Sequence, residues 1–114
     1  MLDSSAIKSE AKKQTNLENF GNPLFLKGFE SLVQSINHEA DLNNIGLEAQ
    51  KHRLTGVLAN LLLIEEACIK HPEILNEEIN SPVVIVGLPR TGSTMTHRLL
   101  ASDPRHTAML WWEG

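Results

Sequence analysis

The first seventy residues alternate apolar and polar positions with the period of an α-helix. The clearest run lies on residues 25–36, where Phe25, Phe29, Leu32, Val33 and Ile36 stand at i, i+4, i+7, i+8 and i+11. This spacing places them on one face of a helix. Asn22 as the cap and Pro23 in the first turn predict where that helix begins. The apolar face is expected to pack into a core.

Two further helices are predicted on either side of this one. Residues 3 to about 18 are mostly polar, with Asp3 or Ser4 as the cap and a thin apolar side, so this helix is expected to dock weakly or to fray. Residues 45 to about 70 carry apolar side chains around much of the circumference, which indicates burial by more than one neighbour. His71-Pro72 ends this helix, because the residue before a proline avoids the α conformation.

The pattern changes at Val83. Residues 83–86 form a short, uninterrupted apolar run of valine and isoleucine, which is typical of a buried strand in a parallel sheet. A loop of small residues follows over 87–94, and residues 95–101 then have a helical pattern. The sequence therefore predicts an α/β fold, a truncated P-loop-like parallel-sheet nucleotide-binding fold preceded by a helical N-terminal segment. The expected domains are residues 1–80 and 81–114.

A strand, a glycine-containing loop and a helix in this order form an anion site, because the free N–H groups and the dipole of the first helical turn favour negative charge. The spacing of Gly87, Gly92 and Thr94 resembles a Walker A loop, G-x-x-x-x-G-K-S/T, but Ser93 occupies the lysine position. The loop's cation is Arg90 instead. This arrangement disfavours an ordinary ATPase or GTPase and favours a phosphate-type anion bound by an arginine and hydroxyl groups.

The loop Pro89-Arg90-Thr91-Gly92-Ser93-Thr94 resembles the 5′-phosphosulfate-binding loop of PAPS-dependent sulfotransferases, where PAPS is 3′-phosphoadenosine 5′-phosphosulfate. The wider run GLPRTGSTMTHRLLASDPRHTAMLWWE is similar to the bacterial-type branch of that family, which has arginine where cytosolic animal enzymes have lysine. Residues 20–23 and 71–75 also look like the N-terminal part of that branch. The resemblance covers nearly the whole chain.

The resemblance implies an enzyme that moves a sulfuryl group from PAPS, as co-substrate, to a hydroxyl or amine acceptor without a metal ion. It assigns donor binding to Pro89, Arg90, Thr91, Gly92, Ser93 and Thr94, whose N–H and hydroxyl groups would hold the 5′-phosphate. Arg90 would stabilise the leaving group at the phosphate–sulfate bridge; its other interpretation is a surface arginine that caps a turn. Glu113 would accept the acceptor's proton. The alternative for Glu113 is a structural role, in an ion pair or a helix cap.

Composition limits the partners and the compartment. The net charge of −4 and the lack of a lysine or arginine cluster argue against a nucleic-acid partner. Cys68 is the single cysteine, so no intrachain disulfide can form, and this suits a reducing cytosol. The N-terminal residues do not resemble a signal peptide, and no apolar run reaches the length of a membrane span. We therefore expect a cytoplasmic protein with a nucleotide donor; the acceptor and the oligomeric state stay open.

Two functions of other classes remain open. One is a degenerate P-loop kinase or NTPase, which predicts Mg²⁺-dependent binding of ATP or GTP. The other is a non-catalytic helical interaction module, whose partner complex would be indifferent to Arg90→Ala. Under the sulfotransferase interpretation, further strands and the 3′-phosphate site are expected after Gly114. The chain is then expected to be an N-terminal portion that is inactive alone.

Overall fold

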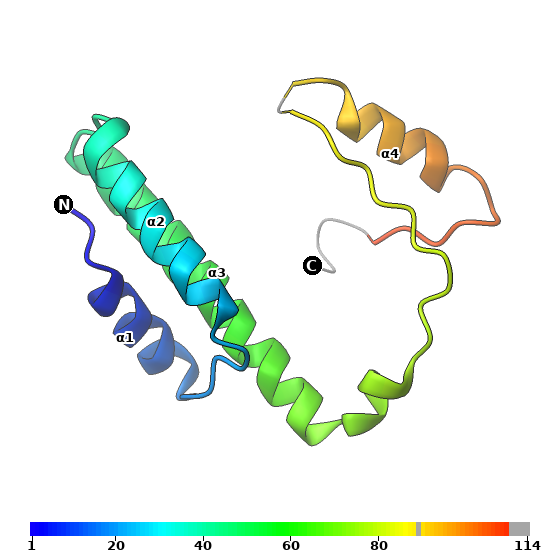
Figure 1. Ribbon diagram of the computed structural model, residues 1–114, viewed down its shortest axis with the longest axis horizontal. Helices are drawn as coiled ribbons and strands as arrows, with labels where there is room; N and C mark the ends of the chain where they lie inside the picture. Colours follow the sequence, from blue (N-terminus) through cyan, green and yellow to red (C-terminus); the bar gives the residue numbers. More distant parts are fainter. Residues whose placement is uncertain (89, 110–114) are drawn as a thin grey trace. The chain divides into compact units, whose positions relative to one another are not determined.

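The computed structural model describes residues 1–88 and 90–109. Their regular secondary structure consists of helices (Figure 1). The helices are α1 (Ser4–Thr15), α2 (Leu24–Glu39), α3 (Asn44–Lys70), the 3-10 helix η1 (Pro72–Asn76) and α4 (Ser93–Ala101). The chain divides into two compact units, the first spanning Met1–Glu77 and the second beginning at Glu78. None of the described helices has both the length and the apolar character needed to cross a membrane.

Helices α2 and α3 begin and end close to where the sequence predicts. The Asn22 side chain accepts a hydrogen bond from the Leu24 N–H at 3.0 Å, and the Asn43 side chain caps α3 by accepting from the Gly46 N–H at 2.8 Å. Helix α3 ends at Lys70, immediately before the His71-Pro72 pair. The N-cap residue of α2 is Pro23 and not the predicted Asn22, whereas the Asn43 cap and the His71-Pro72 pair set the two ends of α3 locally.

Helix α1 docks firmly on α3, and the expectation of weak docking is wrong. Ile7 and Ala11 of α1 are 1% and 0% exposed, and they join Leu58 and Leu62 of α3 in one apolar core. The small Ala11 side chain allows close approach of the two helices. The backbone of α2 lies farther from α3 than that of α1 does: in the described structure, no Cα atom of α2 is within 8 Å of a Cα atom of α3. A thin apolar side is thus sufficient when its residues, here Ile7 and Ala11, are fully buried.

Leu2, two residues before α1, is also held in place within the first unit. The Leu2 N–H donates to the Asn37 Oδ1 atom at 2.7 Å, and the Asn37 Nδ2 atom donates to the Leu2 carbonyl at 2.9 Å. The Leu2 side chain is 7% exposed and belongs to the core. One amide side chain of α2 thereby satisfies both backbone polar groups of Leu2, and this pair of bonds ties the start of α1 to α2.

The predicted burial of α3 on most of its circumference is only partly seen. Leu54, Leu58 and Leu62 are buried, but Val57 and Ile64 are 59% and 58% exposed. These exposed residues border an apolar groove between α2 and α3 that also includes Phe25 and Leu32. Within the described part of the first unit, α3 is therefore covered on one side only.

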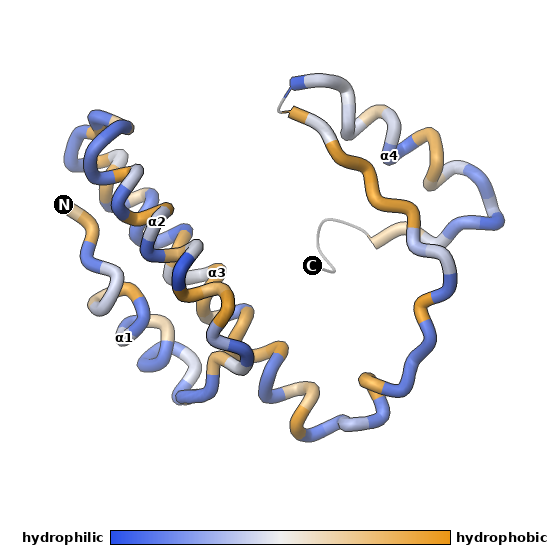
Figure 2. Tube along the Cα trace, viewed as in Figure 1, coloured by the Kyte–Doolittle hydropathy of each residue, from blue (hydrophilic) through white to orange (hydrophobic). Residues whose placement is uncertain are grey.

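The predicted α/β P-loop-like parallel-sheet fold is wrong for the part of the chain that the structure describes. Residues 82–88 form no strand, and Val83, Val84 and Val86 are 64%, 75% and 87% exposed. Figure 2 shows this run as a continuous apolar stretch of the second unit. A strand requires a neighbouring strand for its hydrogen bonds, and no described segment pairs with this run. A β-branched composition indicates only that a segment suits a sheet.

The docking of α1 gives a direct prediction. Ile7→Ala removes a fully buried side chain, so we expect it to lower the free energy of unfolding by about 2–5 kcal/mol. Ile69→Ala is the matched control, since Ile69 is 60% exposed on α3, and its effect should be about 0.5 kcal/mol. Urea denaturation followed by circular dichroism measures both. Equal losses in the two variants would contradict the docked position of α1.

Candidate anion-binding loop

The candidate site is the loop of residues 87–92 and the first turn of α4. Gly92 is the N-cap residue of α4 and has the left-handed backbone conformation, with φ of 87°. No side chain caps this helix within the described residues. The first backbone hydrogen bond runs from the Thr96 N–H to the Gly92 carbonyl at 3.0 Å. The N–H groups of Ser93, Thr94 and Met95 precede that bond, so they are donors without a partner inside the helix.

Arg90 also has a left-handed backbone, with φ of 68°. This conformation is unfavourable for a residue other than glycine by about 1–2 kcal/mol. Arg90 and Gly92 lie on either side of Thr91, so two of three consecutive residues are left-handed. Turns of this kind gather backbone N–H groups into concave anion sites. The Arg90 residue is exposed, and its guanidinium forms no ion pair with another described residue.

A hydrogen bond inside the loop links its two halves. The Thr91 hydroxyl donates to the Leu88 carbonyl at 2.6 Å, spanning residues 89 and 90. A Cβ atom at Gly87 would lie 2.9 Å from the Thr91 Oγ1 atom, which is closer than real Cβ contacts. A side chain at position 87 would therefore require the Thr91 side chain to move, and this is a local reason for a glycine at the first Walker-type position.

The structure places five predicted site residues in one continuous, exposed segment. They are Arg90, Thr91, Gly92, Ser93 and Thr94. Pro89 and Glu113, which the sequence also assigns to the site, lie outside the described residues. These five residues are consecutive in the sequence and lie at the N-terminus of α4, and their role in donor binding stays a prediction. The catalytic roles of Arg90 and Glu113 stay predictions.

An ion pair between Arg105 and Asp103 follows α4. The Arg105 Nη2 and Nε atoms donate to the Asp103 carboxylate at 2.6 and 3.0 Å, and the Arg105 N–H donates to it at 3.0 Å. The side-chain hydrogen bond from Arg105, then its backbone bond and the nearby His106, lower the pKa of Asp103 to about 2. The pKa of Arg105 is raised by the same carboxylate. Arg105 therefore stabilises the turn after α4.

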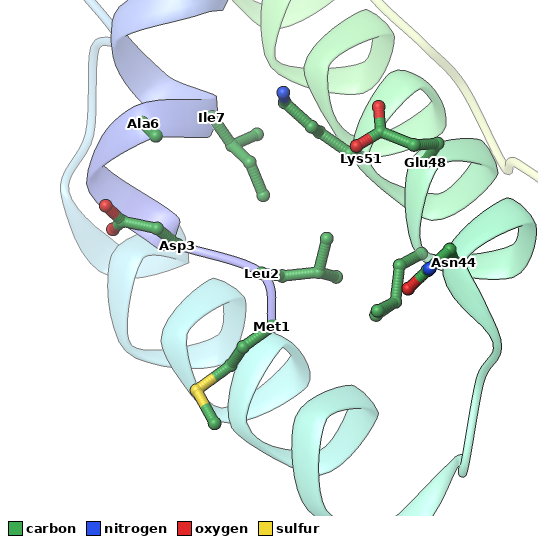
Figure 3. Close-up of a pocket in the computed structure, with 9 residues that line it drawn as sticks. Met1, Leu2, Asp3, Ala6, Ile7, Asn44, Glu48 and Lys51 are labelled. Atoms are coloured by element: carbon green, nitrogen blue, oxygen red, sulfur yellow. The ribbon is translucent and has the colours of Figure 1, made fainter.

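The first unit contains a separate hollow between the start of α1 and the start of α3 (Figure 3). Its polar lining includes Asp3, Asn44, Glu48 and Lys51. Neither this hollow nor the apolar groove along α2 contains a residue of the 87–94 loop. Charge of both signs around the hollow gives no preference for an anion, so the loop remains the candidate site.

The ion pair gives a testable pH dependence. We expect the Asp103 carboxyl to titrate at about 2, and Arg105→Ala to raise its pKa toward the ordinary value of 3.8. Because the folded-state pKa is depressed, the stabilisation of this turn is complete above pH 3.8 and is lost as the pH falls through 2. Carbon-detected NMR of the carboxyl measures both values. Arg98→Ala serves as the control, and a similar shift there would contradict the assignment.

Comparison with known proteins places this loop in a family context. Residues 82–113 match the model of a sulfotransferase family. No curated protein sequence matches the chain. A crystal structure of a sulfotransferase from Mycobacterium tuberculosis matches 97% of the chain with a TM-score of 0.86 and 30% sequence identity. The chain spans 31% of the length of that structure. These two matches confirm the resemblance found in the sequence: the chain is similar to sulfotransferases.

Proposed function

We propose that the protein is a PAPS-dependent sulfotransferase and that residues 89–94 bind the phosphosulfate end of PAPS. The observation that carries this proposal is the uncapped N-terminus of α4 directly after the Arg90 turn, within the segment that matches the sulfotransferase family. Backbone donors, hydroxyl groups and a cation are the groups that bind a phosphosulfate in water.

Donor binding would begin with the first turn of α4. The N–H groups of Ser93 and Thr94 would donate to oxygens of the 5′-phosphate, and the helix dipole would favour the negative charge. Among the described residues, neither hydroxyl of this pair donates a hydrogen bond to a protein group, so both are available to the ligand. The Thr91 N–H would complete the set of donors.

Arg90 would then act at the bond that breaks. In sulfuryl transfer the acceptor oxygen or nitrogen attacks sulfur, and the bond between sulfur and the bridging oxygen of the donor breaks. The electron pair of that bond stays on the departing 3′-phosphoadenosine 5′-phosphate (PAP). A guanidinium at the bridging oxygen would stabilise the charge that develops there. As in phosphoryl transfer, the protein supplies position and charge rather than a covalent intermediate.

The acceptor must also lose a proton as the new bond forms. We propose Glu113 as the general base that receives it, following the resemblance of the segment at 110–113 to the acidic element of the family. The acceptor class is a hydroxyl or amine, since both carry a nucleophilic lone pair and a proton to release.

A nucleoside triphosphate suits this loop less well. The Walker lysine contacts the β- and γ-phosphates, and Ser93 stands at its position with no charge. The loop offers one cation, Arg90, placed before the helix rather than in its first turn. One guanidinium and the helix N-terminus match the charge of one phosphosulfate group better than that of a triphosphate with its metal ion.

NMR titration of the isotope-labelled chain tests the proposal. PAP should shift the amide resonances of residues 91–95, whereas ATP with Mg²⁺ or inorganic sulfate should shift them at much higher concentrations only. Arg90→Ala removes a charge-assisted bond and should weaken PAP binding by about 10- to 100-fold. Arg98→Ala, on the body of α4, should leave it unchanged. The proposal fails if PAP moves none of the loop resonances or if ATP with Mg²⁺ is preferred.

A further inference from the structure

We infer that Thr91 is a positioning residue, whose hydroxyl fixes the backbone of Arg90 through the Leu88 carbonyl instead of binding the donor. The inference rests on the proposed function of the loop as a PAPS site. It separates the three hydroxyl residues of the loop into two roles. Ser93 and Thr94 offer protons to the ligand, and Thr91 shapes the loop that presents the cation.

The hydrogen-bond inventory of Thr91 supports this division. A threonine hydroxyl has one proton to donate, and the oxygens of an ionised phosphosulfate only accept hydrogen bonds. The Thr91 proton is already used in the 2.6 Å bond to the Leu88 carbonyl. Donation to the ligand would require that bond to break, which would leave the Leu88 carbonyl without this donor. The Thr91 hydroxyl is therefore bound to the protein.

The position of that bond explains what it does. It joins residue 88 to residue 91, and Arg90 lies between them with its left-handed φ of 68°. This conformation is disfavoured for arginine, so it persists only where surrounding contacts impose it. The loop is exposed, and Arg90 gains no ion pair among the described residues. The bond that closes the turn is the described contact that opposes relaxation of Arg90.

Gly87 completes the arrangement from the other side. A Cβ atom there would come within 2.9 Å of the Thr91 Oγ1 atom. A threonine side chain can relieve such a contact by rotating about χ1, and that rotation would take the hydroxyl away from the Leu88 carbonyl. Gly87 and Thr91 should therefore behave as a coupled pair.

Two substitutions of Thr91 separate its hydroxyl from its shape. Thr91→Val keeps the branched side chain and removes the hydroxyl; it should weaken PAP binding by about 10-fold and shift the ligand-free backbone resonances of Arg90. Thr91→Ser keeps the hydroxyl and should preserve both properties. Thr107→Val makes the same change at an exposed threonine in the second unit and should alter neither. Circular dichroism checks that the helices are retained.

A double-mutant cycle tests the coupling to Gly87. Gly87→Ala alone should weaken PAP binding about as much as Thr91→Val, because the new methyl group displaces the hydroxyl. In a chain that already carries Thr91→Ala, adding Gly87→Ala should weaken PAP binding little further, since the Thr91 Oγ1 atom that the new methyl group would meet is then absent. Additive losses would show that Gly87 acts independently of Thr91 and would overturn the inference.

The remaining outcomes also decide the matter. If Thr91→Val weakens PAP binding but leaves the ligand-free Arg90 resonances unchanged, the hydroxyl contacts the ligand and the inference is wrong. The inference is also wrong if Thr91→Ser weakens PAP binding as much as Thr91→Val does. If the unmodified chain does not bind PAP, the proposed function fails, whereas the ligand-free Arg90 resonances still decide whether Thr91 positions Arg90.

Discussion

The backbone N–H groups in the first turn of an α-helix have no hydrogen-bond acceptor within the helix, and the candidate site depends on this constraint. In α4 these donors belong to Ser93, Thr94 and Met95, and no described side chain caps them. In the loop before the helix, residues 90 and 92 both have left-handed backbone conformations. A polar or acidic cap at Gly92 would occupy the donors and compete with a ligand. The glycine leaves them accessible.

The two units differ in what stabilises them. In the first unit, apolar burial dominates, because Ile7, Ala11, Leu58 and Leu62 are almost completely removed from water. In the second unit, no described residue is buried. The contacts that shape it are local hydrogen bonds, such as those from Thr91 to Leu88 and from Arg105 to Asp103. Local bonds of this kind contribute modestly to stability, but they determine the direction of the chain. The candidate site therefore lies in a segment whose geometry depends on a few polar contacts.

Much of the helical part could be predicted from the sequence. The period of Phe25 and Phe29 and the stop at Pro72 are local signals, and α2 and α3 follow them. The predicted strand at 83–86 failed because strand formation depends on a neighbour that local sequence does not specify. Docking of α1 could not be predicted, since it depends on how closely Ala11 approaches another helix.

The site shows the same division between local and non-local information. Glycine spacing and the arginine indicated an anion loop, and this loop lies within the segment that matches the sulfotransferase family model. The spacing could not show which hydroxyl bonds to the protein, because Thr91, Ser93 and Thr94 have the same donor group. The structure pairs Arg105 with Asp103 in the turn after α4, through hydrogen bonds from the guanidinium to the carboxylate.

The paired hydrogen bonds between Leu2 and Asn37 have a consequence for how the chain tolerates variation. The two hydrogen bonds of Asn37 go to main-chain atoms of residue 2, so any residue there that can donate an N–H can form them, and burial of its side chain sets the other requirement at that position. Position 37 is far less permissive, since it must supply a donor and an acceptor in one planar group. The attachment of the N-terminus is thus specified by a residue thirty-five positions away.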